Sequence, residues 1–144
     1  MKTIMPAKIS DVKAYGAAFP NLEIEISNKD ACDGLCFAIT ATIKGIFGGK
    51  GMWSTRQRNY RCYIDLTNFP DDFPEVWIRN VPDKNIKHVN VYHEHYCTRL
   101  GLKFPKVCTS HAQEEVRSIN LDAVILYLTS ILSHQNFSDR ARNY

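Results

Sequence analysis

The alternation of hydrophobic and polar residues predicts strands through the first half of the chain. Leucine or isoleucine occupies every second position from 22 to 26, which is the period of a half-buried strand over residues 21–27. β-Branched and aromatic residues predominate over residues 35–44, and a second alternation covers residues 60–66. We expect these two strands to form a hairpin, because the glycines between them favour a turn. Residues 75–79 predict one more short strand.

Two segments have the spacing of amphipathic helices. Residues 7–18 fit a short helix, which Gly16 weakens and Pro20 ends. The stronger pattern covers residues 119–133, with Ser118 as the expected N-cap. Its apolar residues at helical spacing are Leu121, Val124, Ile125, Leu128 and Leu132.

Residues 81–116 lack a clear period and contain proline, histidine, cysteine and glycine. A loop this long inside a compact domain is uncommon and is usually functional. The expected fold class is therefore α+β: an N-terminal helix, a four-stranded antiparallel meander, a long active-site loop and a C-terminal helix packed on the sheet. The length of 144 residues predicts a single domain over residues 1–144.

Charge and composition narrow the expected partners. The net charge of +3 is small and the basic residues are scattered, which argues against nucleic acid as a partner. The sequence contains neither an N-terminal signal peptide nor a run of about 20 apolar residues that would span a membrane. We expect a soluble, cytoplasmic protein without a membrane partner.

The cysteines indicate free thiols. Their number, five, is odd, and their spacing does not fit a disulfide framework or paired zinc knuckles. The cysteines are Cys32, Cys36, Cys62, Cys97 and Cys108. Because Cys97 and Cys108 both fall within residues 81–116, these two are the candidates for a reactive thiol.

The order of motifs over residues 38–143 resembles the ubiquitin-conjugating enzyme (E2) family. Residues 41–45, the glycine-rich turn, residues 60–66 and the proline-flanked residues 68–76 are similar to that family's strand–hairpin–strand region. The resemblance implies a UBC-like fold.

Three later segments extend this resemblance. Residues 86–91 look like the family's His-Pro-Asn motif, with Val89 in place of the proline. Residues 120–132 look like the helix after the active site, and residues 135–141 resemble the segment that closes it. The family's tryptophan before this helix is replaced near Val116, and its last helices have no counterpart. Such trimmed versions resemble bacterial proteins encoded beside ubiquitin-like or antiphage-signalling genes.

The resemblance implies a transferase. An E1-like activating enzyme would pass a ubiquitin-like protein to a cysteine of this chain, which would carry it as a thioester and transfer it to an amine or other acceptor on a target protein. The thiolate is the nucleophile in such chemistry. The domain itself would need no cofactor and no metal.

Two cysteines remain candidates for the nucleophile. Cys97 lies seven residues after Asn90, close to the family interval. Cys108 follows Val107, as the family prefers, and lies 13 residues before Leu121, which matches the usual distance to the helix. The first choice requires an insertion after the cysteine, and the second requires one before it.

The resemblance also assigns the supporting residues. His88 and Asn90 belong to the His-Pro-Asn-like motif, and Asn90 would stabilise the oxyanion or hold the loop in shape. Asp139 would orient or deprotonate the incoming lysine. His111, three residues after Cys108, is a candidate for activating the thiol.

Two other functions stay open. A non-catalytic E2 variant that only binds proteins would explain the missing motif proline and tryptophan. A zinc-stabilised interaction domain is the third hypothesis, because four potential ligands are close in sequence. These are His88, His93, His95 and Cys97.

Overall fold

The computed structural model describes residues 7–47, 56–116, 119–138 and 140–142 and has an α+β fold. Its helices are α1 (Ile9–Ala18), α2 (Ala112–Glu115) and α3 (Leu121–Ser133), with 3₁₀ turns at Pro20–Leu22, Asn28–Asp30 and Asp83–Asn85. The main sheet contains β4 (Ala38–Ile46), β5 (Gln57–Asp65), β6 (Glu75–Ile78), β7 (Val91–Cys97) and β8 (Leu102–Val107). A small second sheet contains β1 (Ala7–Lys8), β2 (Ala31–Cys32) and β3 (Leu35–Cys36).

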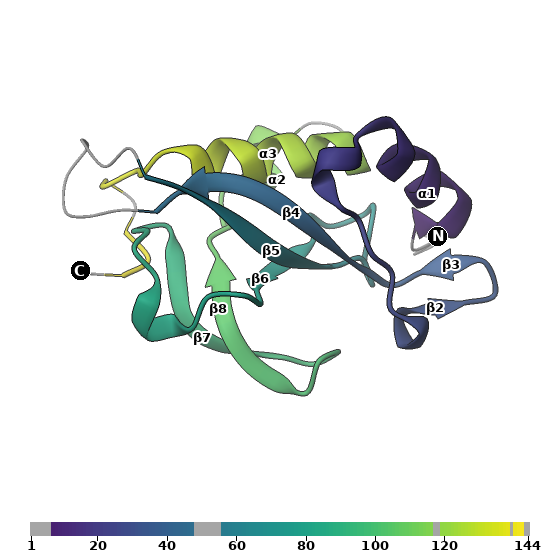
Figure 1. The fold of residues 1–144 in the computed structure, drawn as a ribbon, viewed down its shortest axis with the longest axis horizontal. Coiled ribbons are helices and arrows are strands. Elements are labelled where there is room, and N and C mark those ends of the chain that lie inside the picture. Colours follow the sequence, from purple (N-terminus) through teal and green to yellow (C-terminus); the bar gives the residue numbers. More distant parts are fainter. Residues whose placement is uncertain (1–6, 48–55, 117–118, 139, 143–144) are drawn as a thin grey trace.

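The main sheet is antiparallel, with strand order β4-β5-β6-β8-β7 (Figure 1). Its first three strands form the predicted meander, and the predicted hairpin between β4 and β5 is confirmed from Ala38↔Asp65 to Ile46↔Gln57. The prediction of four strands in meander order is wrong. The sheet has five strands among the described residues, and β8 rather than β7 pairs with β6.

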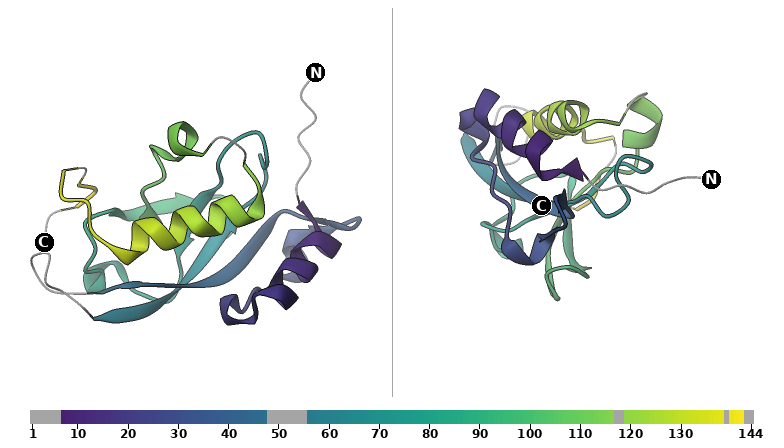
Figure 2. Two further views of the ribbon diagram at one scale, coloured as in Figure 1. Left: turned by 90° about the horizontal axis from the view of Figure 1, so that it is seen from above. Right: turned by 90° about the vertical axis from the view of Figure 1, so that its right-hand side faces the viewer.

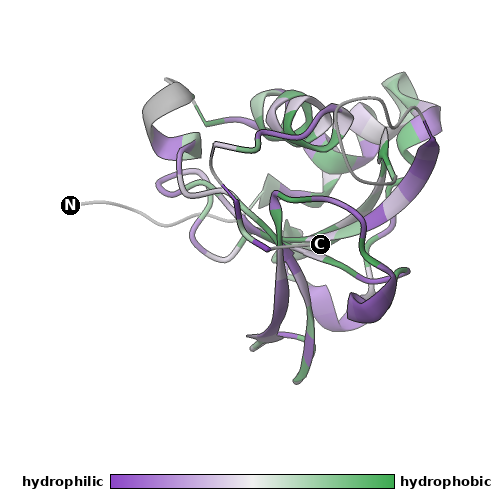
Figure 3. Cartoon of the chain, turned by 90° about the vertical axis from the view of Figure 1, so that its left-hand side faces the viewer, coloured by the Kyte–Doolittle hydropathy of each residue, from purple (hydrophilic) through white to green (hydrophobic). Residues whose placement is uncertain are grey.

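The prediction of a loop over residues 81–116 is also wrong, because much of this segment forms the β7–β8 hairpin. The middle of β7, from His93 to Tyr96, is exposed and polar, so no hydrophobic period marks the strand (Figure 3). Pro105 in β8 argued against a strand as well. It lies opposite Glu94, beside a register shift in β7 where the ladder is already interrupted.

The strand predicted over residues 21–27 does not form a regular strand. The 3₁₀ turn at Pro20–Leu22 is followed by Glu23 with φ of 46°, a left-handed conformation that interrupts extended backbone. Only the bridge Glu25↔Thr40 pairs this segment with the edge of β4. The hydrophobic side chains still turn inward as the alternation predicted, since Ile24 and Ile26 are partly buried against the core.

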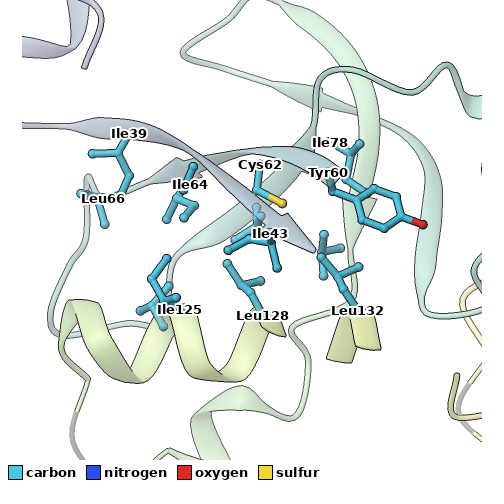
Figure 4. Packing of buried hydrophobic residues seen from close by; sticks show 14 of the residues in the cluster. Ile39, Ile43, Tyr60, Cys62, Ile64, Leu66, Ile78, Ile125, Leu128 and Leu132 are labelled. Atoms are coloured by element: carbon cyan, nitrogen blue, oxygen red, sulfur yellow. The ribbon is translucent and has the colours of Figure 1, made fainter. Parts of the chain in front are cut away.

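The predicted C-terminal helix packs on one face of the sheet (Figures 1 and 2). Alternate residues of β4, β5 and β6 point toward α3 and form the main core (Figure 4). They include Ile39, Ile43, Tyr60, Cys62, Ile64 and Ile78, which meet Ile125, Leu128 and Leu132. Gly45 permits this packing, because a Cβ there would lie 2.6 Å from the carbonyl oxygen of Leu132.

The other face of the sheet carries a smaller apolar cluster. Tyr63 and Trp77 alternate with the core residues of β5 and β6 and therefore point away from α3. The cluster consists of Ala38, Tyr63, Trp77 and Cys97, with Leu100 and Phe104 packed against it. The β7–β8 hairpin thus contributes to both clusters: Cys97 and Phe104 belong to this one, and Val91 and Val107 belong to the main core.

Candidate functional site

A pocket of about 120 Å³ lies between the base of the β7–β8 hairpin and the C-terminal half of α3. Its walls combine a thiol, two imidazoles, two amides, two hydroxyls and one aliphatic side chain. The lining residues are Asn90, Cys108, His111, Tyr127, Ser130, Ile131, His134 and Asn136. Three of the candidate residues predicted from the sequence therefore line one pocket: Asn90, Cys108 and His111.

Hairpin pairing brings Cys108 to Asn90. Val91 and Val107 are partners at the base of the hairpin, and the next residue, Cys108, donates its backbone N–H to the Asn90 carbonyl at 2.9 Å. The Cys108 side chain is 2% exposed. Its Sγ lies 3.3 Å from the Ser110 hydroxyl and 3.6 Å from the Tyr92 hydroxyl. The thiol is thus covered, but by polar groups and at the wall of a pocket.

The Asn90 side chain fastens the segment after α3. Its Oδ1 accepts from the Asn136 N–H at 2.8 Å, and its Nδ2 donates to the Asn136 carbonyl at 3.1 Å. The neighbouring Val89 N–H donates to Gln135 Oε1 at 2.9 Å, and the Val89 carbonyl accepts from the Ala141 N–H at 2.6 Å. Gln135, Asn136 and Ala141 therefore contact Val89 and Asn90 directly.

His88 supports this arrangement from inside. Its ring is fully buried, and Nδ1 accepts a hydrogen bond from the Asn90 N–H at 3.1 Å. Burial lowers its pKa to about 4, so the ring is neutral near pH 7 and Nε2 carries the proton. Nε2 lies near the last carbonyls of α3 but has no partner of hydrogen-bond geometry in the described part of the chain. We infer a structural role for His88.

Cys97 is placed elsewhere. It ends β7, is fully buried, and packs with Ala38, Tyr63 and Trp77 on the sheet face away from α3. Burial raises the pKa of its thiol above the usual value, which disfavours the reactive thiolate. The structure does not bring Cys97 to the pocket that Cys108 lines.

The remaining candidates have mixed placements. His111 lines the pocket from the turn before α2, while Asp139 lies outside the described residues. Sequence reasoning missed the α3 wall, formed by Tyr127, Ser130 and His134 together with Ile131. A signal existed for His134, which directly follows the last residue of the predicted helix, but only the docking of α3 shows what it faces.

The possible zinc ligands do not converge. His88 is buried beside Asn90, whereas the exposed His93 pairs with Asp83 at 3.0 Å and Cys97 belongs to the apolar cluster. Among residues that the structure describes, no three His, Cys, Asp or Glu side chains are grouped to hold a metal ion. No described helix is both long and apolar enough to span a bilayer.

Comparison of the chain with protein-family models, with curated proteins and with solved structures gives no match in any of the three.

Proposed function

We propose that this chain is an E2-like carrier that holds a ubiquitin-like protein as a thioester on Cys108 and transfers it to an acceptor on a target protein. The observation that supports the proposal most directly is the pocket in which Cys108, Asn90 and the segment after α3 meet. This is the arrangement that the resemblance to ubiquitin-conjugating enzymes implies. The UBC-like fold is part of the same proposal.

The reaction requires two exchanges at one sulfur. In the first, the Cys108 thiolate attacks the carbonyl carbon of the activating enzyme's thioester, and the activating enzyme's sulfur leaves and takes up a proton. In the second, an acceptor amine attacks the new thioester, an amide bond forms, and the Cys108 sulfur leaves. The amine loses a proton in this step, and the sulfur regains one.

The pocket offers groups for these proton transfers. His111 and His134 are the histidines on its described walls, and histidine is the side chain that most often acts as a general acid or base in enzymes. The hydroxyls of Ser110 and Tyr92 are close enough to hydrogen-bond the Cys108 sulfur. Asn90 acts in this proposal by positioning, because its side-chain amide already binds the Asn136 backbone.

One observation favours a second candidate, a non-catalytic E2-variant binding module. Cys108 is only 2% exposed, and a nucleophile must reach a protein-sized thioester. In that case the pocket would be a structural remnant, and Gln135, Asn136 and Ala141 would keep their contacts with Val89 and Asn90. The two functions differ in one measurable property, the formation of a covalent adduct.

The test is charging with an E1-like activating enzyme, its ubiquitin-like protein and ATP, followed by non-reducing gel electrophoresis. Wild type is expected to form an adduct that reducing agent removes. Cys108→Ala should abolish it, whereas the matched control Cys97→Ala should retain it, since Cys97 lies in a separate apolar cluster. No adduct, with the activating enzyme shown to be charged, would favour the binding module.

A further inference from the structure

A second concavity, of about 590 Å³, lies between the β7–β8 hairpin and residues 79–84. It is bounded by the segment after β6 and by the middle of the hairpin, and it shares no lining residue with the Cys108 pocket. Its charged and aromatic lining residues are Arg79, Asp83, Lys84, Glu94, Lys103 and Phe104. We call this concavity the basic groove.

The groove has an excess of positive charge. Arg79, Lys84 and Lys103 are exposed, and none of them has an acidic partner among the residues described. The Asp83 carboxylate is already engaged, by Arg142 at 2.5 Å and by His93 at 3.0 Å. Glu94 is thus the only described lining carboxylate without an ion-pair partner, against three unpaired cations.

The walls of the groove are held in place before any ligand binds. The Arg79 guanidinium lies 5.9 Å from the Tyr63 ring centroid and 5.7 Å from that of Phe104, which restricts its freedom. The hairpin turn is anchored by Arg99, which contacts the buried Asp30 carboxylate at 2.9 Å. A ligand would therefore meet a fixed backbone and a restricted Arg79, and the side chains it would have to order are those of Lys84 and Lys103.

The groove also has apolar surface. Phe104 and Pro105 line it from β8, and Val81 and Pro82 line it from the facing segment. Tyr96 is 58% exposed and stands opposite Lys103 in the hairpin register, so both side chains lie on one face of the hairpin. Tyrosine and arginine are both enriched among residues that dominate binding energy, and the groove has Arg79 on its wall and Tyr96 beside Lys103.

We propose that the basic groove binds an acidic segment of a partner protein, with carboxylates on the three cations and an apolar side chain between them. Charge complementarity selects this occupant, and the apolar lining distinguishes it from a purely electrostatic surface. The inference goes beyond the proposed function, because it requires no chemistry at Cys108. Its failure and that of the thioester proposal are separate results.

The test uses a fluorescein-labelled decapeptide of glutamates with one central leucine, followed by fluorescence anisotropy at about 0.15 M salt. Wild type and Cys108→Ala should bind equally. The double variant Lys84→Glu/Lys103→Glu should bind at least about tenfold more weakly, because two attractions become repulsions. Lys84→Gln/Lys103→Gln should lie between them.

The matched control is Lys13→Glu/Lys44→Glu, which changes the net charge equally at exposed lysines outside the groove. This control should lose less than about threefold in affinity, since weak long-range attraction is screened at this salt. Equal weakening in both double variants would overturn the proposal, as would the absence of saturable binding by wild type. Tighter binding of a single-stranded RNA of equal charge, lost in the groove variant, would overturn it as well.

Discussion

The two ends of one hairpin give two cysteines contrasting surroundings. Cys97 closes β7, and Cys108 follows β8. Both side chains are buried, at 0% and 2% exposure. Cys97 contacts aromatic and aliphatic side chains, whereas Cys108 contacts hydroxyls at the wall of a pocket that holds two histidines.

Burial alone therefore does not separate an inert thiol from a candidate nucleophile. The two thiols differ in the face of the sheet on which they lie: Cys97 packs on the face away from α3, and Cys108 lines the pocket beside α3. The β7 end supplies the cluster away from α3, while the β8 end leads the chain toward the C-terminal half of α3. A thiol of the first kind contributes to packing, whereas one of the second kind has hydroxyl groups within hydrogen-bond distance of its sulfur.

The largest expected effect is on thiol alkylation. With iodoacetamide at pH 8, Cys108 should react on the order of a hundredfold faster than Cys97. Both thiols are buried, but Cys108 borders a pocket, whereas Cys97 has a raised pKa and lies in an apolar cluster that must open before the reagent can enter. Peptide mass spectrometry over time measures both rates in one sample. The exposed Cys32 serves as the internal reference. Similar rates for Cys97 and Cys108 would break the comparison.

The second effect concerns pH and His88. Because its folded-state pKa is about 4, below the usual value of about 6.5, the unfolded chain binds a proton in this interval that the folded chain does not. The His88 contribution is fully present above about pH 6.5 and is lost as the pH falls, by about 3 kcal/mol in total. Urea unfolding at pH 7 and pH 4.5 measures it.

His88→Asn should reduce this pH dependence, whereas the control His95→Asn, at an exposed position of β7, should not. His88 accepts a hydrogen bond from the Asn90 N–H, so this titration should weaken the structure at the Cys108 end of the hairpin. An unchanged pH dependence in His88→Asn would contradict the buried, neutral state of the ring.

The smallest effect is on the segment after α3. Asn90→Ala removes two hydrogen bonds to the Asn136 backbone and should lower the free energy of unfolding by about 2 kcal/mol. Alkylation of Cys108 should accelerate, and that of Cys97 should not. The control Asn136→Ala removes the side-chain contacts to Ser138 and part of the pocket wall but keeps the backbone groups that Asn90 binds, and it should cost less than about 1 kcal/mol. Equal acceleration at both cysteines would indicate global loosening instead.

Local patterns predicted the elements whose burial follows a simple period. The helix over residues 119–133 and the β4–β5 hairpin each bury one face against the other. Their hydrophobic residues therefore recur at helical spacing in the helix and at alternate positions in the strands, and both patterns are visible in the sequence. Capping was less predictable. Asn120 caps α3 by accepting from the Ala123 N–H at 2.8 Å, whereas Ser118, the expected cap, lies outside the described residues.

The β7–β8 hairpin escaped prediction because contacts distant in sequence stabilise it. Arg99 binds Asp30, Lys106 binds Glu75, and the exposed strand middle carries no hydrophobic signal. For the same reason the choice between Cys97 and Cys108 stayed open. Asn90 and Cys108 are 18 positions apart in the sequence, and only the pairing of β7 with β8 brings them together, which a local sequence pattern does not show.

Arg142 has a consequence for how separate molecules meet. β7 is the last strand of its sheet, and unpaired carbonyl groups at such an edge can accept a strand from another molecule. The Arg142 guanidinium donates to the Val91 carbonyl at 2.6 Å and to the Tyr92 carbonyl at 2.9 Å. At the start of β7 a single buried side chain thus binds two backbone carbonyls, and at Val91 it occupies a position that an incoming strand would need.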